Sequence, residues 1–104
     1  MLSAGLALLE SQGRFEVRVL TDLTVWNAAS VRAGVLRAWE DRGKPHPLVL
    51  DLAGARHIDS SGVATLLDIA HRIESAGAGL ALTGLSPVMR RMFDRMGLKI
   101  VFRY

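Results

Sequence analysis

Two segments near the start of the chain have the pattern of β-strands. From Phe15 to Leu20 apolar and polar residues alternate, which is the period of a strand with one face in water. A short apolar run, Leu6–Leu9, comes before it, and the gap Ser11–Gly13 between the two segments contains a glycine. A short gap of this kind is typical of a hairpin turn. We therefore expect residues 6–10 and 14–20 to form an antiparallel pair.

Two segments further along the chain have the spacing of helices. Apolar residues recur three or four positions apart over residues 27–42 and again over residues 62–76. Asn27 or Thr24 can cap the first of these helices. Trp39 falls at a core position of this helix, and we expect it to be buried.

Short apolar runs follow each of these helices. Leu48–Leu52 and Leu80–Leu85 are almost unbroken, which fits strands covered on both faces. Ser86–Pro87 then offers a cap and a first residue for a third helix, and residues 98–102 predict a last strand. The order β-β-α-β-α-β-α-β indicates an α/β fold with a mostly parallel sheet. Val88, Met89, Met92, Phe93 and Met96 line one face of the third helix. We assign the stripe Met89, Met92, Phe93 and Met96 to the core, with an adaptable binding face as the alternative.

The composition limits the class of protein. Of the 104 residues, 50% are hydrophobic and 22% are charged, which excludes a disordered chain, and we interpret residues 1–104 as a single domain. The absence of cysteine excludes disulfides, thiolate zinc sites and cysteine nucleophiles. No apolar run approaches the ~18–20 residues that cross a bilayer, and the N-terminus lacks the pattern of a signal peptide. We expect a cytoplasmic protein without direct membrane insertion.

The net charge of +3 is concentrated in the last fifth of the chain. Aromatic residues are few there and are not interleaved with the bases, so we do not expect a nucleic-acid partner. Arg90, Arg91 and Arg95 are interpreted as a solvated helix face, with an acidic partner as the alternative.

The most distinctive motif is Ile58-Asp59-Ser60-Ser61-Gly62, between a buried strand and the next helix. Sites in α/β sheets gather at this end of the strands, where the N–H groups and dipole of the helix favour an anion. Ser61 is a candidate N-cap, with the Ser60 hydroxyl outside the first turn. A phosphate on Ser60 would meet unpaired N–H donors and add negative charge beside Asp59. The simpler interpretation is a capping turn in which Asp59 bonds its own backbone.

Catalytic and metal chemistry finds no support in the sequence. His46, His57 and His71 lack the spacing of metal ligands. A serine hydrolase would need the Gly-x-Ser-x-Gly elbow, and a nucleotide hydrolase a glycine-rich phosphate loop, and both are absent. We predict a protein that is not an enzyme and has no metal or cofactor. Asp51 is interpreted as a strand-end carboxylate bonded to the backbone, and Trp26 is either a packed residue or an exposed anchor for a partner.

Three blocks of the chain resemble the STAS domain family. Leu48–Leu52 followed by Ile58–Gly62 resembles the central motif of that family, and Leu82–Leu98 is similar to its closing strand and helix. Val17–Leu23 is similar to its second strand, so the resemblance covers roughly residues 15–102. It implies an α/β STAS fold with a four- to five-stranded mixed sheet and three helices mainly on one face.

The resemblance also implies a function. In the anti-sigma factor antagonists of this family, a serine kinase that is also the anti-sigma factor phosphorylates the first serine of Asp-Ser-Ser-Gly, here Ser60. The unphosphorylated domain binds the anti-sigma factor, and the phosphate blocks this contact. The implied partner-binding surface comprises Asp22, Thr24, Asp59, Ser60, Ser61, Gly62, Val63 and Leu66.

One block departs from the antagonist pattern. Thr21-Asp22-Leu23-Thr24 lacks the glycine and the second acid that antagonists carry after the second strand. With Asn27-Ala28 after it, this block is closer to the STAS domains of Mla-type lipid-transport ABC systems, whose partners would be the permease or ATPase. A cytoplasmic STAS domain of a sulfate-type anion transporter is a further alternative.

Overall fold

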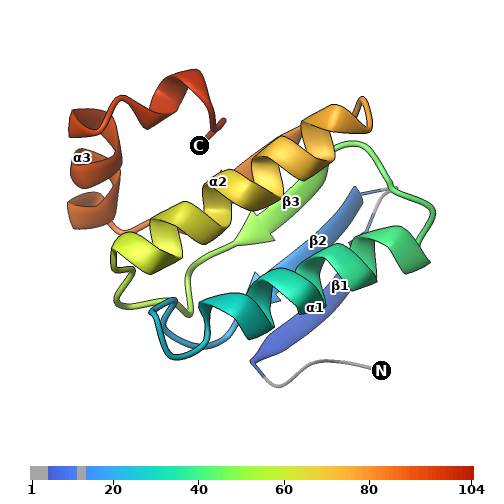
Figure 1. Ribbon diagram of the computed structural model, residues 1–104, viewed down its shortest axis with the longest axis horizontal. Coiled ribbons are helices and arrows are strands. Elements are labelled where there is room, and N and C mark those ends of the chain that lie inside the picture. The colour runs from blue at the N-terminus through green and yellow to red at the C-terminus, as the bar shows by residue number, and fades with distance from the viewer. Residues whose placement is uncertain (1–4, 12–13) are drawn as a thin grey trace.

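The computed structural model describes residues 5–11 and 14–104 (Figure 1). It contains a four-stranded sheet and three α-helices, which confirms the expected α/β class. The elements in chain order are β1 Leu6–Ser11, β2 Arg14–Val19, α1 Ala28–Asp41, β3 Leu48–Asp51, α2 Ser60–Ser75, β4 Leu80–Thr83, α3 Pro87–Arg95 and the 3-10 helix η1 Leu98–Ile100.

The sheet has the order β1-β2-β3-β4 and is mixed. β1 pairs with β2 in the antiparallel sense, as predicted, and β2, β3 and β4 are parallel neighbours. Val17, Leu50 and Leu82 lie in one row across the three parallel strands. The predicted hairpin turn depends on residues 12 and 13, which lie outside the described residues.

Helices α1 and α2 lie side by side over one face of this sheet, and α3 lies beyond the end of β4 (Figure 1). The alternation in β2 sends Phe15, Val17 and Val19 into the core, where they are buried, and leaves Glu16 and Arg18 half-buried on the other face. The helices contribute apolar side chains that water does not reach, and burial of each contributes roughly 1.5–3 kcal/mol. The largest of these side chains are Trp39, Phe93, Leu66, Ile69 and Ile73.

Trp39 is buried as expected, and its indole N–H donates to the Pro45 carbonyl at 3.0 Å. Asp51 also matches its interpretation. One of its carboxylate oxygens accepts the Ala53 N–H at 2.9 Å, and the other accepts Arg18 Nε at 2.9 Å. At this end of β3 the Asp51 side chain therefore satisfies one backbone N–H, that of Ala53, which follows the strand.

The predicted last strand over residues 98–102 is wrong. Gly97 has a φ of 71°, a left-handed conformation that turns the chain, and residues 98–100 form η1. Leu98 and Phe102 are buried in the core, and the centroid of the Phe102 ring lies 6.2 Å from that of Phe93. Only Arg103 reaches the sheet, through an isolated parallel bridge to Ala81.

The expected apolar face of α3 is only partly in the core. Met89 and Phe93 are buried, and Met92 is half-buried, whereas Val88 and Met96 are exposed. Helix α3 lies apart from α1 and α2 (Figure 1), and only Met89 and Phe93 of this helix are fully covered by neighbours.

Candidate functional site

The Asp-Ser-Ser-Gly motif lies where the loop after β3 enters α2, at the carboxyl ends of the parallel strands. The loop after β2 lies against it through an isolated parallel bridge between Leu23 and Ile58. The Leu23 N–H donates to the His57 carbonyl at 2.9 Å, and the Asp59 N–H donates to the Leu23 carbonyl at 3.2 Å. These bonds bring residues 21–27 and 56–62, far apart in the sequence, into one surface.

Asp59 is the N-cap of α2, so the prediction that Ser61 fills this role is wrong. Its Oδ1 accepts the Gly62 N–H at 2.9 Å, and its Oδ2 accepts the Val25 N–H at 3.0 Å. The two N–H groups, Gly62 first, lower the pKa of the Asp59 carboxyl below its usual range. Asp59 is therefore an ionised carboxylate that joins the helix to the neighbouring loop.

Ser60 is the first residue of α2 and is exposed. The helix thus begins earlier than its apolar spacing predicts, and the Ser60 hydroxyl projects from the first turn rather than from outside it. Ser61 follows and is half-buried. Because Asp59 already occupies the Gly62 N–H, a phosphate on Ser60 would meet this carboxylate as well as the helix N-terminus.

Asp22 fastens the two loops together. Its Oδ1 accepts the N–H groups of Arg56 at 3.0 Å and His57 at 3.1 Å, and its side chain is half-buried. The sequence predicts that Asp22 belongs to the partner surface. In the structure, one of its two carboxylate oxygens already accepts hydrogen bonds from the backbone.

Thr24 and Asn27 organise the loop before α1. Thr24 donates its N–H to Asn27 Oδ1 at 2.9 Å, and the Asn27 amide donates to Thr21 Oγ1 and to the Asp22 carbonyl. Asn27 is the N-cap by position, but its side chain makes no bond to the first turn of the helix. Its oxygen and nitrogen instead hold the loop closed, which differs from the predicted capping role.

Gly62 allows α2 to approach the loop after β2. A Cβ at this position would overlap the Leu23 carbonyl oxygen and lie 2.8 Å from Ile58 Cγ2. Val63 and Leu66, which the sequence also assigned to the partner surface, point into the core and are buried. Their side chains support the surface from below and do not form it.

Val25 and Trp26 are the apolar residues of this surface that stand out from the fold. Trp26 is 92% exposed and Val25 is 65% exposed, and the Val25 N–H is held by Asp59. The sequence could not decide whether Trp26 is packed or exposed. The loop between a strand and a helix has no periodicity that would assign this residue to a face. The structure places it at the surface, beside the motif.

Within residues 5–11 and 14–104, no group of three or more His, Asp or Glu side chains could hold a metal ion. None of the described helices combines the length and apolarity that a bilayer-spanning segment needs.

The STAS domain family model matches residues 6–103, and the chain belongs to this family. This confirms the resemblance that the sequence motifs indicated.

Solved structures show the same fold at low sequence identity. A Thermotoga maritima protein proposed to be an anti-sigma factor antagonist superposes with a TM-score of 0.84 at 18% identity, over 97% of this chain and 86% of that one. The phosphorylated form of the Bacillus cell fate determinant SpoIIAA gives 0.66 at 21% identity, over 93% and 87%. A sulfate transporter family protein from Wolinella succinogenes gives 0.72 at 20% identity, over 92% and 81%.

Proposed function

We propose that the protein is a non-enzymatic regulator that binds another protein through the surface around Ser60 and is switched by phosphorylation of Ser60. The observation that carries this proposal is the position of Ser60. Its side chain is exposed at the first residue of α2, next in the chain to the ionised Asp59, which accepts a hydrogen bond from the N–H of the exposed Val25.

The unphosphorylated surface suits a protein partner. Trp26 offers a large apolar anchor of the type that dominates binding energy in interfaces, and the Thr24 hydroxyl lies beside its backbone N–H. Asp22 and Asp59 support this surface through their backbone hydrogen bonds. The predicted partner-binding set therefore divides into residues that contact the partner and residues that hold them in place.

A phosphate on Ser60 would add about −1.5 to −2 charges at neutral pH. This charge would lie beside the Asp59 carboxylate, whose bond to the Val25 N–H fixes the loop that carries Trp26. Repulsion between the phosphate and the carboxylate opposes a partner that buries both, and it weakens the anchoring of the Trp26 loop. Similarity to SpoIIAA, which is known in both forms, supports this switch.

In this proposal the partner is an anti-sigma factor with serine kinase activity, in the cytoplasm. The test is affinity capture from the native host, followed by mass spectrometry of the partners and of Ser60. Binding of the captured kinase is then measured with Ser60→Asp, Ser60→Ala and the matched variant Ser75→Asp, which adds the same charge at an exposed serine at the other end of α2.

We expect Ser60→Asp to weaken binding at least about 100-fold, whereas Ser60→Ala and Ser75→Asp leave it within about threefold of the wild type. Equal binding by Ser60→Asp and Ser60→Ala would exclude the switch.

A stable role in a transporter is the second candidate. The Thr21–Thr24 block favours a Mla-type lipid-transport system, and the similarity to a sulfate transporter family protein supports the anion-transporter alternative. This candidate predicts capture of a permease or ATPase with unmodified Ser60. The exposed Val25 and Trp26 would then form a permanent subunit contact.

A further inference from the structure

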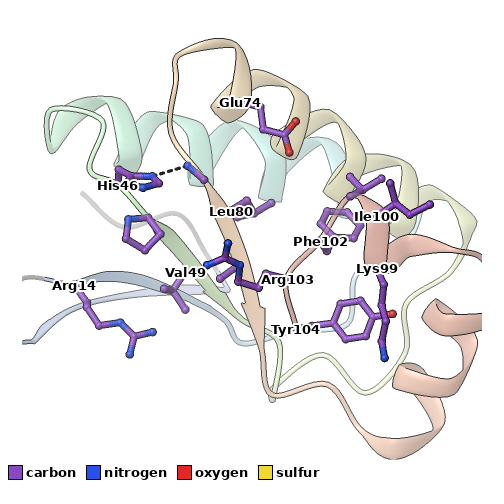
Figure 2. A pocket seen from close by; sticks show the side chains of 14 residues that line it. Arg14, His46, Val49, Glu74, Leu80, Lys99, Ile100, Phe102, Arg103 and Tyr104 are labelled. Atoms are coloured by element: carbon purple, nitrogen blue, oxygen red, sulfur yellow. Dashed lines mark hydrogen bonds between the residues drawn. The ribbon is translucent and has the colours of Figure 1, made fainter.

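A cavity of about 950 Å³ lies along the outer side of β4 (Figure 2). It follows β4 and the segment after η1, and Glu74 of α2 lines it. Ser60 and Glu74 are fourteen residues apart on this helix, a separation of about 21 Å along the axis. The volume is in the range of sites that hold small organic ligands. The cavity is thus a separate feature from the surface around Ser60.

Basic side chains predominate around this cavity. Arg14, Lys99 and Arg103 line it, and Glu74 is its one acidic residue. Lys99 lies 3.7 Å from the Asp94 carboxylate. Arg14 and Arg103 have no carboxylate within ion-pair distance among the described residues, which include all ten acidic residues of the chain. Two guanidinium groups therefore remain for an external anion.

His46 does not add a free donor at Nδ1. That nitrogen accepts the Gly79 N–H at 2.7 Å, a bond that holds the loop before β3 against the start of β4. The dashed line in Figure 2 marks this contact at the edge of the cavity. The positive charge of the site that has no carboxylate partner among the described residues therefore comes from Arg14 and Arg103.

Apolar surface accompanies these charges. Val49 points away from the helices, because its neighbours Leu48 and Leu50 face the core, but its side chain is fully buried and forms only the floor of the cavity. Ala81 of β4 and Val101 also line the cavity and are half-buried. Ile100 is 93% exposed at the opposite wall. A bound apolar group would cover Ile100, which gains about 25 cal/mol for each Å² of apolar surface removed from water.

We propose that this cavity binds a small amphipathic carboxylate, with the anionic group on Arg14 and Arg103 and the apolar body along β4 and Ile100. Guanidinium groups bind carboxylates through paired, charge-assisted hydrogen bonds. Glu74 opposes a ligand of high charge, since a polyanion filling the cavity would approach this carboxylate. One charged group and one apolar body match the surface.

The test uses octanoate as the probe and the whole chain labelled for NMR. Titration to about millimolar concentrations should shift the signals of Val49, Ile100 and Arg103 and leave those of Ser60 and Trp26 unchanged. Acetate lacks the apolar body and 1-octanol lacks the charge, so each should bind at least about tenfold more weakly than octanoate.

Matched charge deletions locate the anionic group. Arg14→Gln and Arg103→Gln should each weaken octanoate binding about tenfold, which is the usual effect of losing a hydrogen bond to a charged group. Arg37→Gln removes the same charge from an exposed position of α1 outside the cavity and should have no effect. Circular dichroism shows whether each variant is folded. Two cavity variants are used so that one still tests the proposal if the other disturbs folding.

Several results would overturn the proposal. These are equal binding of octanol and octanoate, shifts centred on Trp26, equal losses for the Arg37 and Arg103 variants, or no shift in the titration. Octyl phosphate separates two headgroups of the same charge sign. Binding of octyl phosphate more than tenfold tighter than octanoate would reject the carboxylate.

Discussion

At the carboxyl ends of β2 and β3, Asp22 and Asp59 accept hydrogen bonds from four backbone N–H groups. At the far end of the same sheet, Arg14 and Arg103 have no carboxylate partner among the described residues. The two carboxylates hold the loops of the fold together, whereas the two guanidinium groups are available to a ligand. A charged residue in a motif therefore needs its hydrogen-bond partners counted before it is assigned to binding.

The same comparison holds for apolar side chains. Around the motif, Val63 and Leu66 are buried and the loop leaves Trp26 in water, and near the cavity Phe102 is buried and Ile100 is in water. Each end thus presents one large apolar group beside polar ones. The Ser60 end is formed by two loops that hydrogen-bond to each other, whereas the cavity lies along β4 and the segment after η1.

The largest expected effect tests how tightly the Ser60 end is packed. Gly62→Ala should lower the free energy of unfolding by about 3 kcal/mol, because its Cβ overlaps the Leu23 carbonyl oxygen. Gly43→Ala, before the cavity-side loop, has open space and only a φ of 80° to strain it, and should cost about 1 kcal/mol. Urea unfolding measures both, and a larger loss at Gly43 would contradict the packing argument.

A smaller effect is expected from Asp59. Asp59→Ala removes the acceptor of two N–H groups and should lower the melting temperature by about 5 °C. The control is Asp68→Ala on the same helix, where the carboxylate is exposed and lies 3.9 Å from Arg32, and little change is expected. Equal melting temperatures for the two variants would show that the cap does not fasten the loop.

The stabilisation by Asp59 should also depend on pH in the acid range. The pKa of Asp59 is lower in the folded than in the unfolded protein, so its ionised form stabilises the fold above the unfolded value of about 3.9. That stabilisation is lost as pH falls through the folded pKa. Urea unfolding from pH 6 downward should show a constant difference between wild type and Asp59→Asn, which shrinks below about pH 4. A difference that grows in acid would contradict the assignment.

The smallest effect concerns the wall of the cavity. Tyr104 is the single tyrosine of the chain, and burial together with its 2.5 Å hydrogen bond to Asp94 raises its pKa to about 12. Ultraviolet titration should therefore give one midpoint near this value, and Asp94→Asn should lower it. A midpoint near the usual value of about 10 would show that this wall is open.

Much of the fold could be predicted from the sequence. Periods of two and of three to four residues gave β2, α1 and α2, and the apolar runs gave β3 and β4. The strand predicted over residues 98–102 was wrong because an apolar run fits a strand and a packed turn equally well. The turn at Gly97 and the packing of Phe102 on Phe93 depend on tertiary contacts.

The place of the Asp-Ser-Ser-Gly motif in the fold was predictable, and its hydrogen bonds were not. Asp-Ser-Ser-Gly was found because polar residues interrupt the pattern between a strand and a helix. Its cap is Asp59 rather than Ser61 because the Val25 N–H, from another loop, holds the second oxygen of that carboxylate. The cavity had no sequence signal, since Arg14 and Arg103, which both line it, come from opposite ends of the chain.

The two tryptophans differ in their access to solvent, with Trp26 at 92% and Trp39 at 1% exposed. The protein therefore contains two intrinsic fluorophores, one at the surface and one in the core, that report on different events. Iodide in solution can quench the emission of Trp26 and does not reach Trp39. Docking of a partner near Ser60 would protect Trp26 from the quencher, whereas unfolding would expose Trp39. An unlabelled sample can thus distinguish binding from loss of structure in one optical measurement.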